Sequence, residues 1–141
     1  MINAKPQNFS WITPNLTVSD PDAAIDFYAK AFGIEKLDTI GDDAGKTIHA
    51  ELKYKDQTLI LAKEGMFDDG SNTLKTPANS GVPSPNILYV YTENVDELYK
   101  SALEAGATSK MEPRDMYWGD RMCQLLDIDG HTWCFATSIK G

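Results

Sequence analysis

The sequence feature that most constrains the fold is an approximate duplication at a spacing of 74 residues. A shift by this spacing places the segment ELKYKDQTLILA on LLDIDGHTWCFA without a gap, so that Leu52 falls on Leu126. Identity between the copies is low, but the expected order of helices and strands repeats. We therefore predict an α+β fold made of two βαβββ modules, residues 8–63 and 84–138, within a single domain.

Each module contains one stretch with clear helix start and stop signals. In the first module Asp20 is a good N-cap, Pro21 occupies the first helical position and Gly33 ends the helix. In the second module Asn94 is the N-cap and Gly106 ends the helix. Each module is therefore expected to contribute one helix of about three turns.

The remaining regular segments are rich in β-forming residues and alternate in hydrophobicity, as expected of strands. They are residues 10–18, 34–41, 45–54, 57–63 and 85–92, a short strand near 108–112, and a hairpin over 119–137 that turns at the sequence IDG. Residues 64–83, rich in Gly, Ser, Asn, Asp and Pro, form a long loop that joins the modules. The segment EPRDMYWGD forms another loop before the hairpin.

One helix covers only one face of a four-stranded sheet, so the opposite faces are expected to curve around a shared cleft. Because side chains alternate along a strand, Leu16 and Val18 are expected to face the helix, and so are Leu88 and Val90. The side chains expected to face the cleft are Thr13, Asn15, Thr17, His49, Glu51, Ile87, Tyr89, Tyr91, Thr132, Cys134 and Ala136.

The bulk composition narrows the class of function. The net charge is −8, so a polyanion such as nucleic acid is repelled and a cationic ligand is favoured. No apolar run approaches the roughly 20 residues of a membrane span, and no signal-peptide pattern is present, so we expect a cytoplasmic protein. Its two cysteines, Cys123 and Cys134, are then expected to be free thiols.

A family resemblance is carried by the repeat and by three sequence segments. These segments are PNLTVSDPDAAIDFYAKAFG, HAELKYKD and YWGDRMCQLLDIDGHTWCFAT. The chain resembles the vicinal oxygen chelate (VOC) superfamily, which includes glyoxalase I, bleomycin resistance proteins and extradiol dioxygenases, and it is most similar to the PhnB-like branch. This resemblance implies paired βαβββ modules around a cleft, and it implies a homodimer. It does not imply one activity, because the superfamily hosts unrelated chemistries on one scaffold.

The resemblance also implies where a metal would be held. Metal-dependent members carry His or Glu at four positions, which correspond here to Thr13, Glu51, Ile87 and Cys134. A divalent metal centre needs at least three good N, O or S donors, and this set does not supply them. We therefore expect no metal and no other cofactor. An alternative is that His49 joins Glu51 as a chelating pair, although a polar pair lining a pocket is preferred.

The sequence allows more than one arrangement of the two cysteines and of the aromatic loop. If Leu126 pairs with His131, Cys123 lies opposite Cys134 and the thiols form a dithiol; if Asp127 pairs with His131, they are diagonal or near. In the aromatic loop, Trp118 either stacks on a ligand or packs in the core. Arg121 either holds an anionic ligand group or pairs internally with Asp120 or Glu51.

These features support three hypotheses about function. The first is a metal-independent protein that binds a small organic ligand through Thr13, Asn15, Tyr89, Trp118, Arg121 and Cys134, with His49 and Glu51 nearby. The second is a lyase or isomerase in which Glu51 acts as general base, tuned by His49, with or without a divalent metal. The third is a noncatalytic assembly module. The sequence contains no P-loop, G-x-S-x-G, dinucleotide or C-x-x-C motif.

Overall fold

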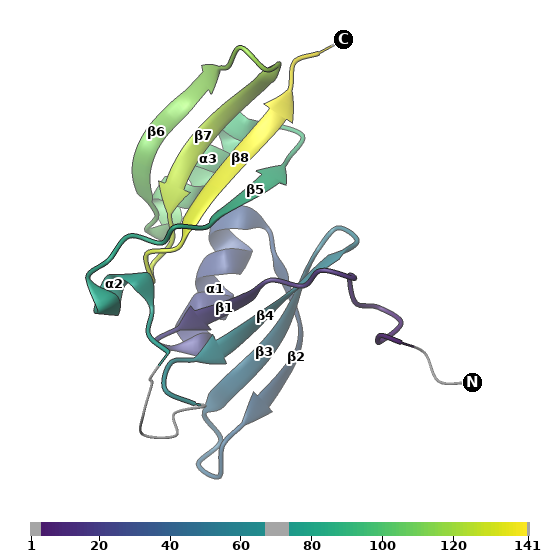
Figure 1. The fold of residues 1–141 in the computed structure, drawn as a ribbon, viewed down its shortest axis with the longest axis vertical. Helices are drawn as coiled ribbons and strands as arrows, with labels where there is room; N and C mark the ends of the chain where they lie inside the picture. Colours follow the sequence, from purple (N-terminus) through teal and green to yellow (C-terminus); the bar gives the residue numbers. More distant parts are fainter. Residues whose placement is uncertain (1–3, 67–73, 141) are drawn as a thin grey trace. The chain divides into compact units, whose positions relative to one another are not determined.

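The computed structural model of the protein describes residues 4–66 and 74–140. The chain divides into two compact units, one made of Met1–Ala29 with Gly33–Lys75 and the other of Lys30–Phe32 with Thr76–Gly141. Each unit contains a four-stranded mixed sheet, as predicted (Figure 1).

The first sheet has the order β1-β4-β3-β2. Its elements along the chain are β1 (Asn15–Val18), α1 (Pro21–Phe32), β2 (Glu35–Gly41), β3 (Thr47–Tyr54) and β4 (Gln57–Lys63). Strand β1 is parallel to β4, and the other neighbouring pairs are antiparallel. The unit is therefore one βαβββ module.

The second sheet repeats this order as β5-β8-β7-β6. Its unit contains α2 (Pro77–Ser80), β5 (Ile87–Tyr91), α3 (Val95–Ala105), β6 (Thr108–Asp115), β7 (Asp120–Leu126) and β8 (Thr132–Ser138). Strand β5 is parallel to β8, and β6–β7 and β7–β8 are antiparallel. The same topology in both units supports the predicted duplication.

Both long helices begin and end where the sequence predicts. The Asp20 side chain accepts hydrogen bonds from the backbone N–H groups of Asp22 and Ala23, and Gly33 ends α1 in the left-handed conformation. Asn94 accepts a hydrogen bond from the backbone N–H of Glu97 at the start of α3. These caps satisfy N–H groups that a helix end would otherwise leave unpaired.

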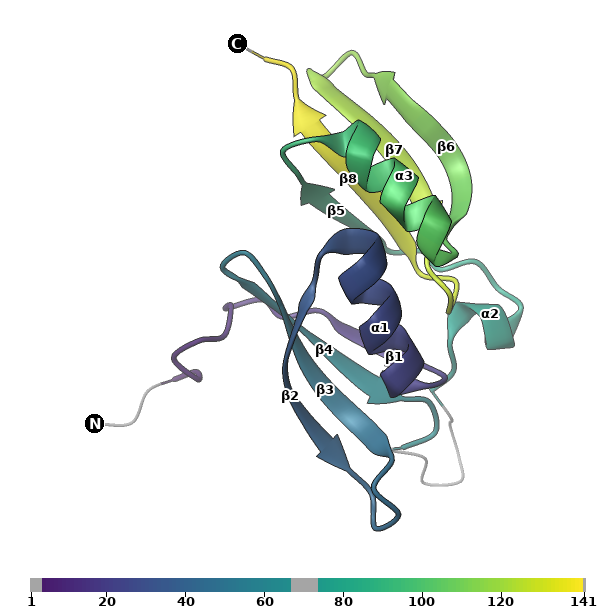
Figure 2. The ribbon, with the colours of Figure 1, turned by 180° about the vertical axis from the view of Figure 1, so that it is seen from behind.

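Each sheet buries one face of its strands on the side of its own long helix (Figure 2). On these helix-facing sides the buried apolar side chains of the first sheet include Leu16, Val18, Ala50, Leu52, Leu59 and Leu61, and those of the second include Cys123, Leu125, Trp133 and Phe135. The alternation predicted for β1 is therefore confirmed, whereas β8 is buried on both faces from Thr132 to Ala136. On the other face of the second sheet, Tyr89 and Tyr91 of the edge strand β5 are exposed.

The main differences between predicted and observed boundaries concern β1, β6 and the loop between the modules. Strand β1 begins at Asn15, because the segment before it is held by Ser10, which exchanges backbone and side-chain hydrogen bonds with Thr58. Strand β6 continues to Asp115, so the loop before the hairpin contains only residues 116–119. The predicted loop 64–83 contains the short helix α2, and its residues 67–73 lie outside the described part of the chain.

The alignment of the two modules without a gap is wrong over one strand. Asn15 pairs with Ile60 just as Tyr89 pairs with Cys134, which agrees with the 74-residue spacing. However, Ile60 pairs with Glu51, whereas Cys134 pairs with Gln124. Over this strand the spacing is therefore one residue shorter.

The difference arises in the hairpin turns. The first hairpin turns through Lys55 and Asp56, whereas the second turns through residues 128–130 between Asp127 and His131. A shift of one residue along a strand moves each side chain to the other face. The fully buried Leu52 therefore corresponds to the fully buried Leu125, not to Leu126.

Candidate functional site

A connected group of aromatic and acidic side chains lies on the face of the second sheet that is opposite α3. Tyr89 and Tyr91 both donate hydrogen bonds to Oδ2 of Asp120, at 2.7 Å and 2.9 Å. The indole Nε1 of Trp118 donates to the hydroxyl of Tyr89 at 3.1 Å. We call these four residues the Tyr–Asp cluster.

Small residues on β8 make this cluster possible. The tyrosines belong to the edge strand β5 and Asp120 to β7, and β8 lies between these strands. The two side chains therefore cross β8, a span of about 10 Å from β5 to β7. The residues paired with the tyrosines on β8 are Cys134 and Ala136, whose short side chains leave room for the rings and are buried.

The cluster holds a carboxylate and two protonated phenols at neutral pH. The hydrogen bonds from Tyr89 and Tyr91 lower the pKa of the Asp120 carboxyl, although burial opposes this shift. Burial and the hydrogen bond to Asp120 raise the pKa of Tyr89 to about 12. The hydrogen bond to Asp120 also raises the pKa of Tyr91. The negative charge is therefore stable beside the rings.

Sulfur-containing side chains adjoin the cluster. Met122, Cys134 and Ala136 form a buried apolar group, against which Met111 and Met116 pack. The Tyr89 hydroxyl also lies 3.8 Å from the sulfur of Met122. Methionine side chains are flexible and polarizable, so they fill irregular space beside the cluster.

The two cysteines do not form the dithiol considered from the sequence. In the register of β7 and β8, Cys123 pairs with Phe135 and Cys134 with Gln124. Neighbouring positions on a strand point to opposite faces, so Cys123 faces the helix and Cys134 faces the other way. The three-residue turn causes this register, and the alternative in which the cysteines are directly opposite is wrong.

Arg121 lies on the helix-facing side of β7 and is held by two carboxylates. Its Nε and Nη2 donate to Asp96 at 2.9 Å and 3.0 Å, and its Nη1 donates to Asp115 at 3.1 Å. These partners differ from the predicted internal partners Asp120 and Glu51. The bidentate geometry fixes the guanidinium away from the Tyr–Asp cluster.

Of the site residues predicted in the first unit, some lie close together and Thr13 has a local structural role. His49 and Glu51 share a face of β3 and are both half-buried. Asn15 is next to Ile60, which in turn pairs with Glu51. The Thr13 hydroxyl donates to the carbonyl of Ser10 at 3.0 Å, so this hydroxyl serves the local structure.

The side chains at the four family metal positions do not make a suitable donor set. Ile87 has no donor atom, the Thr13 hydroxyl is engaged with Ser10, and Cys134 is buried. Among residues 4–66 and 74–140, no three His, Cys, Asp or Glu side chains gather into a group able to hold a metal ion. Glu51 is left as a single carboxylate, so we derive no metal-dependent step.

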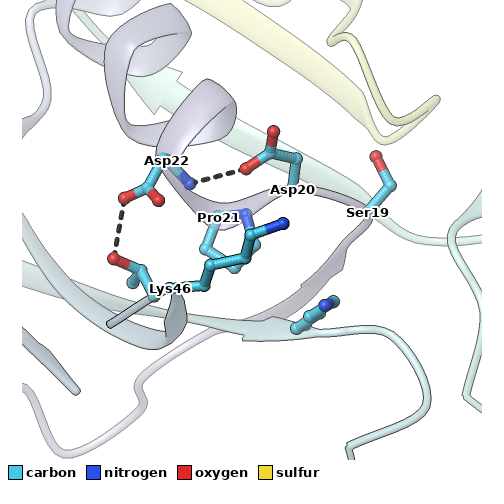
Figure 3. Close-up of a pocket in the computed structure, with 7 residues that line it drawn as sticks. Ser19, Asp20, Pro21, Asp22 and Lys46 are labelled. Carbon is cyan, nitrogen blue, oxygen red and sulfur yellow. Dashed lines mark hydrogen bonds between the residues drawn. The ribbon is translucent and has the colours of Figure 1, made fainter. Parts of the chain in front are cut away.

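A pocket at the start of α1 was not predicted from the sequence (Figure 3). It is lined by Ser19, Asp20, Pro21, Asp22, Lys46, Thr47 and Lys63. Its acidic residues have structural roles, because Asp20 caps the helix and Asp22 accepts a hydrogen bond from Thr47 at 2.7 Å. No sequence motif marks this pocket.

The DGHTW motif of the last hairpin is a structural turn. The Asp127 carboxylate accepts hydrogen bonds from the backbone N–H groups of Asp129 and His131 and from Nε1 of Trp133, each at 2.9 Å. Both Asp127 and Trp133 are buried. The motif therefore anchors the turn to the core.

Two members of the Tyr–Asp cluster were missing from the predicted site. Asp120 was considered only as a partner for Arg121, although adjacent residues on one strand face opposite ways. Tyr91 was predicted to share the face of Tyr89 but was not included in the site. Trp118 is 37% exposed, so it does not pack in the core. The alternation of tyrosines on β5 was the signal that could have found the cluster.

Comparison with known proteins identifies the family. Residues 9–135 match the Glyoxalase/Bleomycin resistance protein/Dioxygenase superfamily, and the chain belongs to this family. It is 33% identical to the uncharacterized protein Rv0887c of Mycobacterium tuberculosis over 139 residues, which cover 99% of this chain and 78% of the relative. A similar uncharacterized protein of Mycobacterium bovis is also 33% identical, with 99% and 88% covered.

Solved structures share the fold. TioX from Micromonospora sp. ML1 has a TM-score of 0.71 and 24% identity, with 92% of this chain and 98% of that chain covered. The PhnB protein from Bacillus cereus, described as a putative 3-demethylubiquinone-9 3-methyltransferase, has a TM-score of 0.64 and 18% identity, with 92% and 100% covered. At these identities the likeness concerns the fold. No helix among the described residues is long and apolar enough to cross a membrane.

Proposed function

We propose that this protein binds a small organic ligand, without a metal, on the face of the second sheet that carries the Tyr–Asp cluster. The observation that carries the proposal is the exposure of Tyr89 and Tyr91 above a buried carboxylate, Asp120. Aromatic side chains beside a few well-placed polar groups are typical of the lining of small-molecule sites. Cys134 lines the floor of this site, and Trp118 lies at its edge.

The acidic composition supports a cationic ligand. The net charge of −8 attracts cations at long range, and Asp120 supplies a negative charge at the site, which the Lys140 ammonium partly offsets. Of the residues predicted to bind the ligand, Tyr89, Trp118 and Cys134 belong to this site. Arg121 is engaged by Asp96 and is not part of our proposal.

A thermal-shift screen of cationic, neutral and anionic compounds tests the proposed function. A bound compound at about 100 times its dissociation constant adds roughly 2.7 kcal/mol to the free energy of unfolding, which gives a clear shift. We expect hits whose effect is lost in Tyr91→Leu and kept in Tyr99→Leu, since Tyr99 bonds Ser109 away from the cluster. Hits that survive Tyr91→Leu unchanged contradict the proposed site.

A second candidate is a lyase or isomerase in which Glu51 is the general base and His49 its neighbour. It is favoured by one observation, the position of both half-buried side chains on the same face of β3. The test incubates each screening hit with the protein and follows its chemical conversion by NMR. Conversion that is lost in Glu51→Gln, while binding remains, supports the enzyme; hits that bind without conversion support the binding protein.

We also propose a cytoplasmic homodimer. Free buried thiols suit a reducing compartment, and several large apolar side chains, including Trp11 and Ile12, are exposed in the single chain. Light scattering coupled to size-exclusion chromatography is expected to give twice the mass of the 15.6 kDa chain. A monomer at micromolar concentration contradicts this assignment.

A further inference from the structure

Gln124 is a polar side chain in an apolar part of the face that carries the Tyr–Asp cluster. It belongs to β7, a central strand of the second sheet, and it pairs with Cys134 on β8 and with Met111 on β6. Paired residues point to the same side of a sheet, so Gln124 shares its face with these two sulfur-containing side chains. Its same-face neighbours along β7 are Met122 and Leu126. All four neighbours are apolar or only weakly polar.

The amide of Gln124 has no internal hydrogen-bond partner. Within residues 4–66 and 74–140, none of the hydrogen bonds of the structure involves its side chain. Gln124 is half-buried, and neither of its amide atoms is fully buried, so a ligand can reach both of them. The basic side chain of Arg114, which pairs with Met122, lies on the same face and carries only donors.

The stability of the sheet does not explain an amide at this position. Strand interiors favour β-branched and aromatic residues, and an apolar side chain would pack better against four apolar neighbours. A half-buried amide without a partner instead loses part of its hydration. A role in binding accounts for the amide of Gln124 where folding does not.

A ligand that covers Gln124 displaces water from both amide atoms. The amide offers N–H donors beside a carbonyl acceptor. A ligand that leaves either atom unpaired binds less tightly, because the desolvated group has lost its hydrogen bonds to water. The best complement is therefore a group that presents an acceptor beside a donor.

We infer that Gln124 is a specificity-determining residue of the proposed site and that the ligand carries a carbonyl group beside an N–H group, as carboxamides, lactams and imides do. The inference rests on the proposed function, because it concerns a ligand on the same face of the second sheet. Asp120 lies four residues from Gln124 on β7, roughly 13 Å along the strand, so the two residues contact different parts of one ligand.

Titration of the full ¹⁵N-labelled chain with three matched probes, followed by NMR, tests the inference. The probes are benzamide, N,N-dimethylbenzamide, which has no N–H group, and benzoate, which has only acceptors. We expect benzamide to bind about fivefold more tightly than either of the others and to shift the side-chain NH₂ signal of Gln124. The side-chain signal of Gln57, which bonds Asp56 in the first unit, is the internal control.

Two results of this titration overturn the inference. The first is equal affinity for benzamide and its dimethyl analogue, or no binding of benzamide. The second is a preference for benzoate that is lost in Arg114→Gln, because the site then selects an anion through Arg114.

A variant separates a role in binding from a role in folding. Gln124→Met removes the amide and keeps the length of the side chain. It is expected to weaken benzamide binding about fivefold and to leave the binding of N,N-dimethylbenzamide at least as tight. The midpoint of urea denaturation is expected to stay unchanged or to rise. Gln57→Met is the matched control and changes neither property. A lower midpoint for Gln124→Met shows that the amide serves the fold and overturns the inference.

The outcomes also separate the ligand class from the proposed function. If a hit of the thermal-shift screen loses affinity in Tyr91→Leu but not in Gln124→Met, the ligand class is wrong and the proposed function stands. If the hits lose affinity in neither variant, both are wrong. A hit that loses affinity in both variants and carries a carbonyl beside an N–H group supports both.

Discussion

The hydroxyl of Tyr91 on β5 lies 2.9 Å from Oδ2 of Asp120 on β7, although strand β8 separates the two strands. This hydrogen bond depends on Ala136, the partner of Tyr91 on β8, which is fully buried and has the smallest side chain compatible with regular strand geometry. The same strand carries Cys134 where metal-dependent relatives would carry a ligand. The Cys134 thiol thus belongs to the part of β8 that the rings of Tyr89 and Tyr91 cross.

The first prediction concerns the pKa of Asp120. The hydrogen bonds from Tyr89 and Tyr91 lower this pKa below its ordinary value of 3.8. The double variant Tyr89→Phe/Tyr91→Phe removes both donors and leaves burial, so the pKa is expected to rise. A titration followed by carboxyl ¹³C NMR measures the change, and an unchanged pKa contradicts the assigned hydrogen bonds.

The direction of the pH effect on stability follows from the same shift. A pKa that is lowered on folding contributes stability above the unfolded-state pKa, and this stability is lost as the pH falls through the folded-state pKa. The unaltered protein should therefore lose stability from Asp120 below about pH 4. In the double variant this contribution is smaller, because only Trp118 and Lys140 still lower the pKa of Asp120, so denaturation curves between pH 3 and 6 should show a weaker acid dependence.

The second prediction concerns the two thiols. Burial raises the pKa of Cys123 to about 11 and also raises the pKa of Cys134. Both side chains are buried, so alkylation of the native protein at pH 8 should be at least about 100-fold slower than that of free cysteine. Mass spectrometry measures the rates, with protein in denaturant as the fully reactive control. Rapid labelling of Cys134 would show that the tyrosine rings do not cover it.

The third prediction concerns the turn of the last hairpin. Asp127→Ala leaves the buried Nε1 of Trp133 without its acceptor and removes the two backbone hydrogen bonds of the turn. We expect a loss of about 2–4 kcal/mol in the free energy of unfolding, measured by chemical denaturation. The control is Asp56→Ala in the turn of the other hairpin, whose carboxylate bonds the exposed Gln57 and should matter by less than about 0.5 kcal/mol.

The fourth prediction compares two glycines with positive φ. Gly130 has φ of 88° and Gly45 has φ of 81°, so alanine is strained at both, by about 1–2 kcal/mol. A Cβ at Gly130 would lie 2.9 Å from the backbone nitrogen of Ala78, whereas a Cβ at Gly45 would meet no atom within 4 Å. Gly130→Ala should therefore cost about 1–3 kcal/mol more than Gly45→Ala. Equal losses would mean that α2 does not pack against this turn.

The sequence was sufficient to predict the helices and strands and to predict which side chains of most strands face the helix. Helix caps at Asp20 and Asn94 are local signals, and they marked both helices correctly. Alternation on β5 placed Tyr89 and Tyr91 on the face opposite the helix, because a strand reverses its side chains at each residue. The duplication then predicted that the second unit repeats the βαβββ order of the first.

The sequence was not sufficient to predict which side chains form hydrogen bonds or ion pairs with one another. Both possible turn lengths fit the IDG segment, and they place Cys123 and Arg121 differently across the sheet. The observed three-residue turn puts Arg121 on the helix-facing side, where Asp96 binds it. The crossing of the tyrosines over β8 depends on two small residues in another strand, so it required the register of β5 and β8.

The most direct test of the central claim, that a small ligand binds on the face bearing the Tyr–Asp cluster, is NMR of protein labelled with ¹³C at the methionine methyl groups. Met111, Met116 and Met122 lie together beside the cluster, whereas Met66 lies in the first unit and serves as an internal control. Each compound that stabilises the protein is expected to shift the Met122 signal and to leave the Met66 signal in place. A stabilising compound that shifts Met66 alone, or none of the three clustered methionines, would contradict the account.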